Sequence, residues 1–365
     1  MRYLIRVIKL KKELGKIMQT IKKMANDNNF IAKHRRSQKD FVRTRELTFA
    51  DIVYFILGKT GNPLDLETMR FCQTMHKEVT APAVCKARDK INYTAFKELL
   101  QQTSQAIPPK NLYRGYRLTS ADGMIGELPR TPELMEKYQH SKESLYPQFC
   151  TMAEYDVLNC VYTNAVFAPA PANERTLFYS LLEEHNYDDK EIFLLDRGFP
   201  SVKLIQQMEK RGKSFVMRVP GNFLKEVDEF GKISLKDKTV HINYDKARKR
   251  ANRVDFEGKE YVFDLRLVKI DLPKGKTEIL ITNLPKTEFT RLDIGELYNY
   301  RWRIETAFLD LKYAVHVEEF MSRKENSIKQ EFYASLIQAN LAMLFMGVAN
   351  QVLLSKKKWC KSWSM

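Results

Sequence analysis

The residues best suited to chemistry lie on one face of a predicted helix near residue 300. Four polar side chains recur there at separations of three, four and seven positions: Tyr298, Arg301, Glu305 and Lys312. At about 100° per residue they fall within roughly a 60° arc, so a helix over 297–312 presents one carboxylate flanked by two cations and a phenol. Such a set can bind charged groups. The simpler alternative is a surface ion pair between Arg301 and Glu305, worth only tenths of a kcal/mol.

Two aspartates enlarge this set. Asp196 ends the apolar run 192–195 and is followed by Arg-Gly-Phe-Pro, while Asp122 ends the run 118–121 and precedes Gly123. Sites form where the strands of α/β sheets end, although an Asp-Gly pair alone is more often only a turn. We therefore expect Asp122, Asp196 and Glu305 to be delivered from three separate parts of one α/β domain.

The elements that must position these residues alternate along the middle of the chain. Strand-like runs are expected at 117–121, 192–195 and 214–219, and helices at 174–184 and 201–211, which is the pattern of a layered α/β sheet. From 221 to 290 the helical pieces vanish, and alternating runs at 239–244, 253–256, 260–270 and 277–281 predict a strand-rich insertion. Helices return between 292 and 353.

The remaining segments complete a division of the chain into parts. Residues 1–46 carry 14 Lys+Arg against four acids, and residues 47–110 are predicted to form a small helical domain that ends at a Pro-Pro linker. We expect a basic N-terminal segment (1–46), a helical DNA-binding domain (47–110), the first part of the catalytic domain (111–220), a β-strand insertion (221–290) and the second part with a basic C-terminal tail (291–365).

The charge balance points to a polyanionic partner. The 365 residues hold 61 Lys+Arg against 45 Asp+Glu, a formal net charge of +16, and clustered cations attract nucleic acid and release its counterions. The alternative is a basic protein whose charge only aids solubility. Two local clusters of cations could either contact DNA or form a solvated surface. One is Lys86 and Arg88, and the other is Lys246, Arg248, Lys249, Arg250 and Arg253.

Several classes of protein are not expected. The sequence contains no apolar run of the length that crosses a membrane and no secretory cleavage pattern, so we expect a soluble, intracellular protein. Its five cysteines are scattered and never spaced as C-x-x-C, so neither a disulfide framework nor a zinc site is expected.

Three blocks of the sequence resemble a known family. Asp122-Gly123, the block L-L-D-R-G-F-P at 194–200 and the pattern Y-x2-R-x3-E-x6-K at 298–312 are similar to the D, D and E blocks of the DDE transposases of bacterial insertion sequences. The third block resembles the signature of the insertion-sequence-four branch. The resemblance extends from about residue 40 to about residue 351.

The resemblance implies a fold and a mechanism. The fold would be α/β, a ribonuclease H-like catalytic domain with a β-rich insertion, preceded by a small all-α domain. Asp122, Asp196 and Glu305 would be the catalytic residues and would hold two Mg²⁺, which Mn²⁺ can replace. Arg301 and Lys312 would bind DNA phosphates, Tyr298 would donate a hydrogen bond to one, and Trp302 is a further candidate DNA contact.

The implied reaction is metal-dependent cleavage of double-stranded DNA at the element's terminal inverted repeats and strand transfer into target DNA. The expected setting is the bacterial cytoplasm, associated with the nucleoid, with a homodimer in the DNA-bound synaptic complex. A hairpin intermediate stays open, because relatives can use a tryptophan of the insertion, and here Trp302, Trp359 and Trp363 all lie outside it. Two other functions stay open: a catalytically silent, domesticated DNA-binding protein, and a ribonuclease H-like nuclease without strand transfer.

Overall fold

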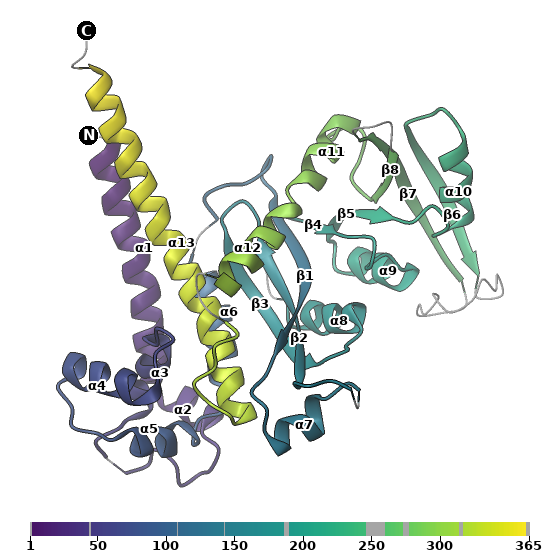
Figure 1. The fold of residues 1–365 in the computed structure, drawn as a ribbon. Helices are drawn as coiled ribbons and strands as arrows, with labels where there is room; N and C mark the ends of the chain where they lie inside the picture. Colours follow the sequence, from purple (N-terminus) through teal and green to yellow (C-terminus); the bar gives the residue numbers. More distant parts are fainter. Residues whose placement is uncertain are drawn as a thin grey trace.

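The computed structural model describes residues 2–43, 45–107, 109–141, 143–185, 190–245, 260–272, 277–313 and 317–362. Figure 1 shows a bundle of helices joined to a mixed sheet by a long C-terminal helix, with both termini at the same end of the molecule. None of the described helices combines the length and apolar character needed to cross a bilayer.

The N-terminal region is helical, as predicted for residues 47–106. Its elements are α1 (Arg2–Ala25), α2 (Asn28–His34), α3 (Phe49–Leu57), α4 (Leu64–Met75), α5 (Ala81–Arg88) and α6 (Thr94–Gln105). The basic segment at the start of the chain is part of this core, because Ile17, Ile21 and Ala25 of α1 are buried. Helix α1 lies along α13 (Glu325–Ser362) and also packs on α3 and α6 (Figure 1).

The sheet has eight strands in the order β3-β2-β1-β4-β5-β8-β7-β6. Their bounds are β1 Arg117–Glu127, β2 Gln148–Asp156, β3 Val161–Pro169, β4 Glu191–Leu195, β5 Ser214–Val219, β6 Asp237–Asp245, β7 Glu260–Asp271 and β8 Thr277–Thr282. Strands β3, β2 and β1 are antiparallel, and β1, β4 and β5 are parallel. The order 3-2-1-4-5 with this pattern is that of a ribonuclease H-like domain, so the predicted fold class is confirmed.

Helices cover both faces of the sheet. One face packs on α8 (Glu174–Glu184), α9 (Val202–Lys210) and α10 (Lys225–Lys232), and the other packs on α6, α11 (Arg291–Asn299), α12 (Trp302–Tyr313) and α13. A short helix, α7 (Pro132–Tyr138), follows β1. Because side chains alternate along a strand, Leu194 of β4 faces the α12 side while Leu195 faces the α8 side.

The segment 221–290 corrects one expectation. Its strands β6, β7 and β8 extend the same sheet beyond β5, but helix α10 also lies here, although no helix was predicted. The sequence of α10 is short and charged, and its Val227 and Phe230 are buried because they pack on a face of the sheet. The strand predicted at 253–256 lies outside the described residues, and the proposed division into domains stays a prediction.

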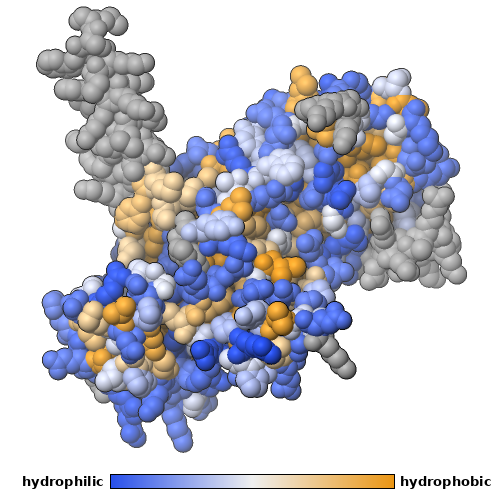
Figure 2. Space-filling model, viewed as in Figure 1, coloured by the Kyte–Doolittle hydropathy of each residue, from blue (hydrophilic) through white to orange (hydrophobic). Residues whose placement is uncertain are grey.

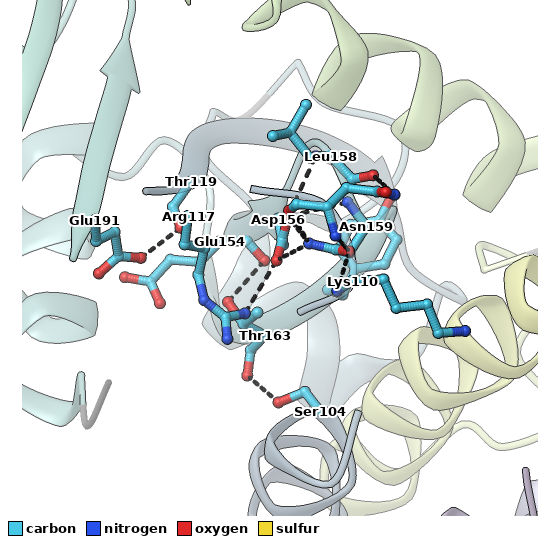
Figure 3. Close-up of polar contacts among 12 residues, drawn as sticks. Ser104, Lys110, Arg117, Thr119, Glu154, Asp156, Leu158, Asn159, Thr163 and Glu191 are labelled. Carbon is cyan, nitrogen blue, oxygen red and sulfur yellow. Dashed lines mark hydrogen bonds and ion pairs between the residues drawn. The ribbon is translucent and has the colours of Figure 1, made fainter. Parts of the chain in front are cut away.

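A buried polar network holds the starting ends of β1 and β4 together (Figure 3). Thr119 of β1 donates a hydrogen bond to Glu191 at the start of β4, and Glu191 also accepts from His185 at 2.7 Å. The other ring nitrogen of His185 lies 3.2 Å from Glu154 of β2. Burial alone would lower the pKa of His185, but Glu154 and Glu191 outweigh it and raise this pKa to about 10. A charged imidazole between two buried carboxylates thus ties three strands together.

A second buried network joins the helical region to α13. Arg88 of α5 is 3% exposed and donates to Gln330 (2.9 Å), to the carbonyl of Ser327 (2.6 Å) and to Glu331 (2.5 Å). Glu331 also lies 3.5 Å from the ammonium of Lys59 and is itself fully buried. Arg88, a candidate DNA contact from sequence, therefore has its guanidinium inside the protein and not on the surface.

We expect Arg88→Ala to lower the free energy of unfolding by about 3–5 kcal/mol, because it leaves the buried carboxylate of Glu331 without its closest cation. Denaturant titration followed by circular dichroism measures this change. Lys86→Ala is the control, since Lys86 is exposed on the same helix and should shift stability by less than about 0.5 kcal/mol. Equal losses in the two variants would contradict the assigned role of Arg88.

Candidate active site

The two aspartates lie next to each other at one end of the sheet. Strands β1 and β4 are parallel, and their last paired residues are Ser120 and Leu194. Two residues further, the same register places Asp122 beside Asp196. Alternation along each strand directs both side chains toward the face covered by α11 and α12.

Asp122 does not end its strand, contrary to the expectation from the sequence. Strand β1 continues to Glu127 in antiparallel pairing with β2, and Gly123 lies within it opposite Met152. The element that ends is β4, whose last residue is Leu195. Asp122 therefore lies one residue beyond the point where its neighbour β4 ends, and its side chain is partly buried there.

The segment with the third carboxylate is two helices, where one was predicted over 297–312. Between α11 and α12 the backbone forms hydrogen bonds to the residue three positions earlier, as in a 3₁₀ turn. The N–H of Arg301 donates to the carbonyl of Tyr298 (3.1 Å), and the N–H of Ile304 donates to the carbonyl of Arg301 (3.2 Å). Tyr298 lies at the end of α11 and Glu305 in the first turn of α12.

Both helices are fixed at defined points. Helix α11 begins with a capping box between Thr290 and Asp293, and Arg114, just before β1, pairs with Asp293 at 2.8 Å. Helix α12 is fixed by Arg303, which donates to the carbonyl of Val157 at 2.9 Å. These contacts determine where Glu305 lies relative to β1.

Asp196 is surrounded by donors. Tyr298 donates to its Oδ1 at 3.0 Å, and Arg218 of β5 approaches the same oxygen at 2.9 Å. Burial would raise the pKa of Asp196, but the Arg197 N–H, the charges of Arg301 and Arg218, and the Tyr298 hydrogen bond together hold this pKa below its usual value. Asp196 is thus kept ionised.

Asp122 has the opposite environment. Burial raises the pKa of its carboxyl to about 6, although the Gly123 N–H and the charge of Arg301 act in the other direction. The negative charges of Glu174 and Glu305 add to the increase. A partly buried carboxylate next to other acids is stabilised when a cation joins it.

Arg301 links the carboxylates. It is 2% exposed, pairs with Glu305 at 2.9 Å and lowers the pKa of both Asp122 and Asp196 through its charge. Its guanidinium lies over the ring of Trp302, 4.4 Å from the centroid, and its Nε has no hydrogen-bond partner within the described part of the chain. Trp302 is half exposed beside it.

Not every sequence candidate joins this group. Lys312 pairs with Glu318 at 3.0 Å, two helical turns from Glu305. Trp302 lies at the site, Lys86 is exposed on α5 and Arg88 is buried. The cations Lys246, Arg248, Lys249, Arg250 and Arg253 lie outside the described residues.

Two residues at the site were missed from the sequence. Arg218 bonds both to Asp196 and, at 2.6 Å, to Glu278 of β8. A lone cation in the apolar strand 214–219 was the available signal. Glu174, the first residue of α8, lies close to Gly123 and Gly198, and no sequence pattern marked it, because acids are common in the first turn of helices.

The donors present fit a hard divalent cation. All are carboxylate oxygens, which Mg²⁺ prefers, and Mg²⁺ needs only one or two of them because water and substrate phosphate supply the remaining ligands. Among the described residues no three His, Cys, Asp or Glu side chains are already close enough to hold a metal. Glu305 would have to turn from Arg301 toward Asp122 and Asp196.

A basic groove lies in the helical region, apart from these carboxylates. Its volume is about 800 Å³, and it runs between the loop 38–47 and the residues of α5 and its flanks. Its lining includes the cations Lys39, Arg43, Arg45, Lys86 and Lys90, against the acids Asp40 and Glu46. None of the five cations forms an ion pair within the residues that the structure describes. The outer surface around α4 and α5 is mostly hydrophilic (Figure 2).

We expect Asp122→Asn to stabilise the metal-free protein at pH 8 by about 1–3 kcal/mol. The folded-state pKa is about 6 and the unfolded value is ~3.9, so ionisation costs stability increasingly as pH rises between these values. The difference from the wild type should vanish near pH 4. Thermal melts in chelator across this range measure it.

The control for this substitution is Asp310→Asn, which neutralises an exposed acid on α12 and should show no such pH dependence. Mg²⁺ should raise the melting temperature of the wild type at pH 8 more than that of Asp122→Asn. If Asp122→Asn changed the stability equally at every pH, the effect would not come from ionisation of the Asp122 carboxyl.

The known proteins that this chain resembles are transposases. The model of the transposase DDE domain family matches residues 113–341. Transposase InsG of insertion sequence element IS4 from Escherichia coli (strain K12) is 25% identical over 274 residues, which cover 72% of this chain and 60% of InsG. The transposase of element IS231F from Bacillus thuringiensis subsp. israelensis is 22% identical, over 90% of this chain and 80% of the relative.

A cryo-EM structure of the piggyBac transposase synaptic complex with hairpin DNA aligns with a TM-score of 0.48 and 12% identity, over 93% of this chain and 76% of that one. The match to InsG spans less than two thirds of InsG's length. The family match covers well over half of the chain and contains β1, β4 and α12 with their three carboxylates. The chain therefore belongs to the DDE transposases, within the insertion-sequence-four family.

Proposed function

We propose that this protein binds the ends of an insertion sequence and catalyses metal-dependent DNA cleavage and strand transfer. The observation that carries the proposal is the placement of Asp122 beside Asp196 at the end of β4, with Arg301 joining Glu305 to them. When bound, two Mg²⁺ would activate the attacking oxygen and stabilise the leaving oxygen of an in-line phosphoryl displacement.

The protein's own residues have separable roles in this proposal. Asp122, Asp196 and Glu305 would hold the metal ions. Tyr298 and Arg218 orient Asp196 and keep it ionised. The hydroxyl of Tyr298, which the sequence resemblance assigned to a DNA phosphate, therefore donates to the Asp196 carboxylate in this structure. Lys312, with a partly exposed side chain, is free enough to exchange Glu318 for a DNA phosphate.

Arg301 would bind a phosphate beside the cut once Glu305 turns to the metal, because that turn frees one of its donors in a buried setting where charge interactions are strong. Trp302 offers an exposed ring at the same place. Four aromatic side chains of the β-strand insertion could replace the tryptophan of relatives. Tyr244 and Phe263 are buried, Tyr261 is partly buried and donates to Glu209, and Phe256 lies outside the described residues, so the hairpin step stays open.

DNA would be held by the groove in the helical region. Five cations that have no ion-pair partner among the described residues line it, and phosphate contacts from Lys and Arg supply most of non-specific DNA affinity. We further propose terminal inverted repeats and target DNA as the substrates, a homodimer in the synaptic complex, and association with the bacterial nucleoid.

The catalytic proposal predicts that Asp122→Asn, Asp196→Asn and Glu305→Gln each lower cleavage of end DNA by at least about 100-fold, because each removes a ligand worth several kcal/mol. Affinity for the ends should change little, since cations dominate binding. Nicking and joining of labelled DNA are measured with Mg²⁺ and with Mn²⁺, and Asp310→Asn is the control.

Each outcome of this assay has a distinct meaning. Cleavage that survives in one variant removes that residue from the site. Binding by the wild type without any cleavage indicates a silent DNA-binding protein, and cleavage without joining indicates a nuclease. Either of the last two results overturns the proposed function.

The groove proposal predicts that Arg43→Ala and Lys86→Ala each weaken binding to end DNA and to random DNA alike. Each should also reduce the slope of log K against log salt by about 0.9 for a lost phosphate contact. Fluorescence anisotropy over a salt series measures both. Substitutions are preferable to deletion of residues 1–45, because deletion would remove the buried residues of α1.

The control is Lys225→Ala, an exposed cation on α10 at the far edge of the molecule (Figure 1). It should leave the salt slope unchanged. An unchanged slope in Arg43→Ala and Lys86→Ala would show that DNA follows another surface.

A further inference from the structure

The second cation of the α12 motif is paired with an acid from outside the motif. Lys312 lies in the last turn of α12, and its Nζ is 3.0 Å from the Oε2 of Glu318, which belongs to the segment between α12 and α13. The first cation of the motif also has an internal partner, because Arg301 pairs with Glu305 at 2.9 Å. Each of the two cations therefore has a carboxylate partner within the chain.

The Glu318 carboxylate lies against a glycine of the strand that carries Asp122. A Cβ at Gly126 would lie 2.8 Å from the Oε1 of Glu318 and 2.5 Å from the ring of Phe149, so a side chain at this position would displace both. Gly126 is four residues after Asp122 in β1 and shares its face of the strand. The carboxylate therefore lies beside the strand of the candidate site, about 13 Å along it from Asp122.

Backbone contacts fix the segment that carries Glu318. Val317 is fully buried, and its N–H donates to the carbonyl of Leu311 near the end of α12 (3.3 Å). Three residues after Glu318, the N–H of Met321 donates to the buried carboxylate of Glu331 in α13 at 2.8 Å. The position of Glu318 is therefore set by the chain on both sides of it, and not only by attraction to its cation.

The ion pair between Lys312 and Glu318 is open to exchange. The side chain of Lys312 is 39% exposed and that of Glu318 is 25% exposed, and a partly exposed pair of this kind is held only weakly. A carboxylate and a phosphate offer a lysine the same kind of acceptor, a negatively charged oxygen. A DNA phosphate that binds Lys312 must therefore first displace Glu318.

We propose that Glu318 is an internal competitor of DNA, which occupies the phosphate-binding position of Lys312 until a DNA strand displaces it. The inference rests on the proposed function, in which Lys312 binds a DNA phosphate. It adds a residue that the sequence motif does not contain and that acts against binding. Removal of this acid should therefore strengthen DNA binding, which removal of a purely structural ion pair would not do.

The test is the affinity of the full chain for end DNA in chelator, measured by fluorescence anisotropy. Glu318→Gln keeps the shape of the side chain and removes its charge, so it should tighten binding by about 2- to 5-fold at low salt. The gain should shrink as salt is raised, because salt screens the pair that the substitution removes. Asp310→Asn is the matched control, since it removes one exposed acid from the same helix as Lys312 and reports the effect of net charge alone.

Lys312→Ala determines whether the gain acts through the competed cation. Alone, it should weaken binding. In its background, Glu318→Gln should tighten binding no more than Asp310→Asn does, because the two substitutions act through the same contact. A larger gain that survives without Lys312 would overturn the inference.

The outcomes separate the inference from the proposed function. If Lys312→Ala weakens binding and Glu318→Gln does not tighten it beyond the control, Glu318 is no competitor and the proposed function stands. If Lys312→Ala leaves the affinity unchanged, the proposed phosphate contact fails and the inference fails with it.

A second variant, Glu318→Ala, removes the same charge and should also tighten binding. Melting curves identify any loss of structure in either variant. Tighter binding by a folded variant of either kind supports the inference, and unchanged or weaker binding by both overturns it.

Discussion

The parallel register between β1 and β4 is the constraint on which the site depends. Asp122 and Asp196 are 74 positions apart in the chain, and the register that pairs Arg117 with Glu191 through Ser120 with Leu194 brings them side by side. A buried polar network at the other end of these strands opposes a shift of that register. Thr119 bonds to Glu191 there (Figure 3), and His185 bonds to the same carboxylate. A shift by one residue would turn the aspartates to opposite faces.

The charges of the site follow from its place at the edge of a buried sheet. Burial favours neutral carboxyls, and this raises the pKa of Asp122, whereas two arginines and a phenol keep the neighbouring Asp196 ionised. The two neighbouring carboxyls of the candidate site therefore differ in how readily they ionise. The buried Arg301 also pairs with Glu305, so in the proposed mechanism a Glu305 that turned to a metal ion would release Arg301 for a phosphate, and the two binding events would be coupled.

The sequence predicted the fold class, the helices of residues 47–106 and the strands that carry the aspartates, because apolar periodicity is a local signal. The two-helix break at Tyr300 and Arg301 was not predictable, because no proline or glycine marks it. Arg88 looked like a surface cation, since its buried partner Glu331 lies 243 residues away. Glu174 and Arg218 escaped notice for the same reason, as their meaning depends on neighbours that only the fold supplies.

Helix α13 contacts both the helix beside the basic groove and the loop behind the candidate site. Glu331 of α13 binds Arg88 of α5, which ends beside the basic groove, and accepts the N–H of Met321 in the loop that follows α12. The chain of contacts therefore runs from the groove through one buried carboxylate to the connection behind Glu305. Because every member of this chain is buried or backbone-bonded, DNA held in the groove would lie at a defined distance from the carboxylates. Cleavage at a fixed position relative to a bound end requires that property, and a flexible linker between the two surfaces would not supply it.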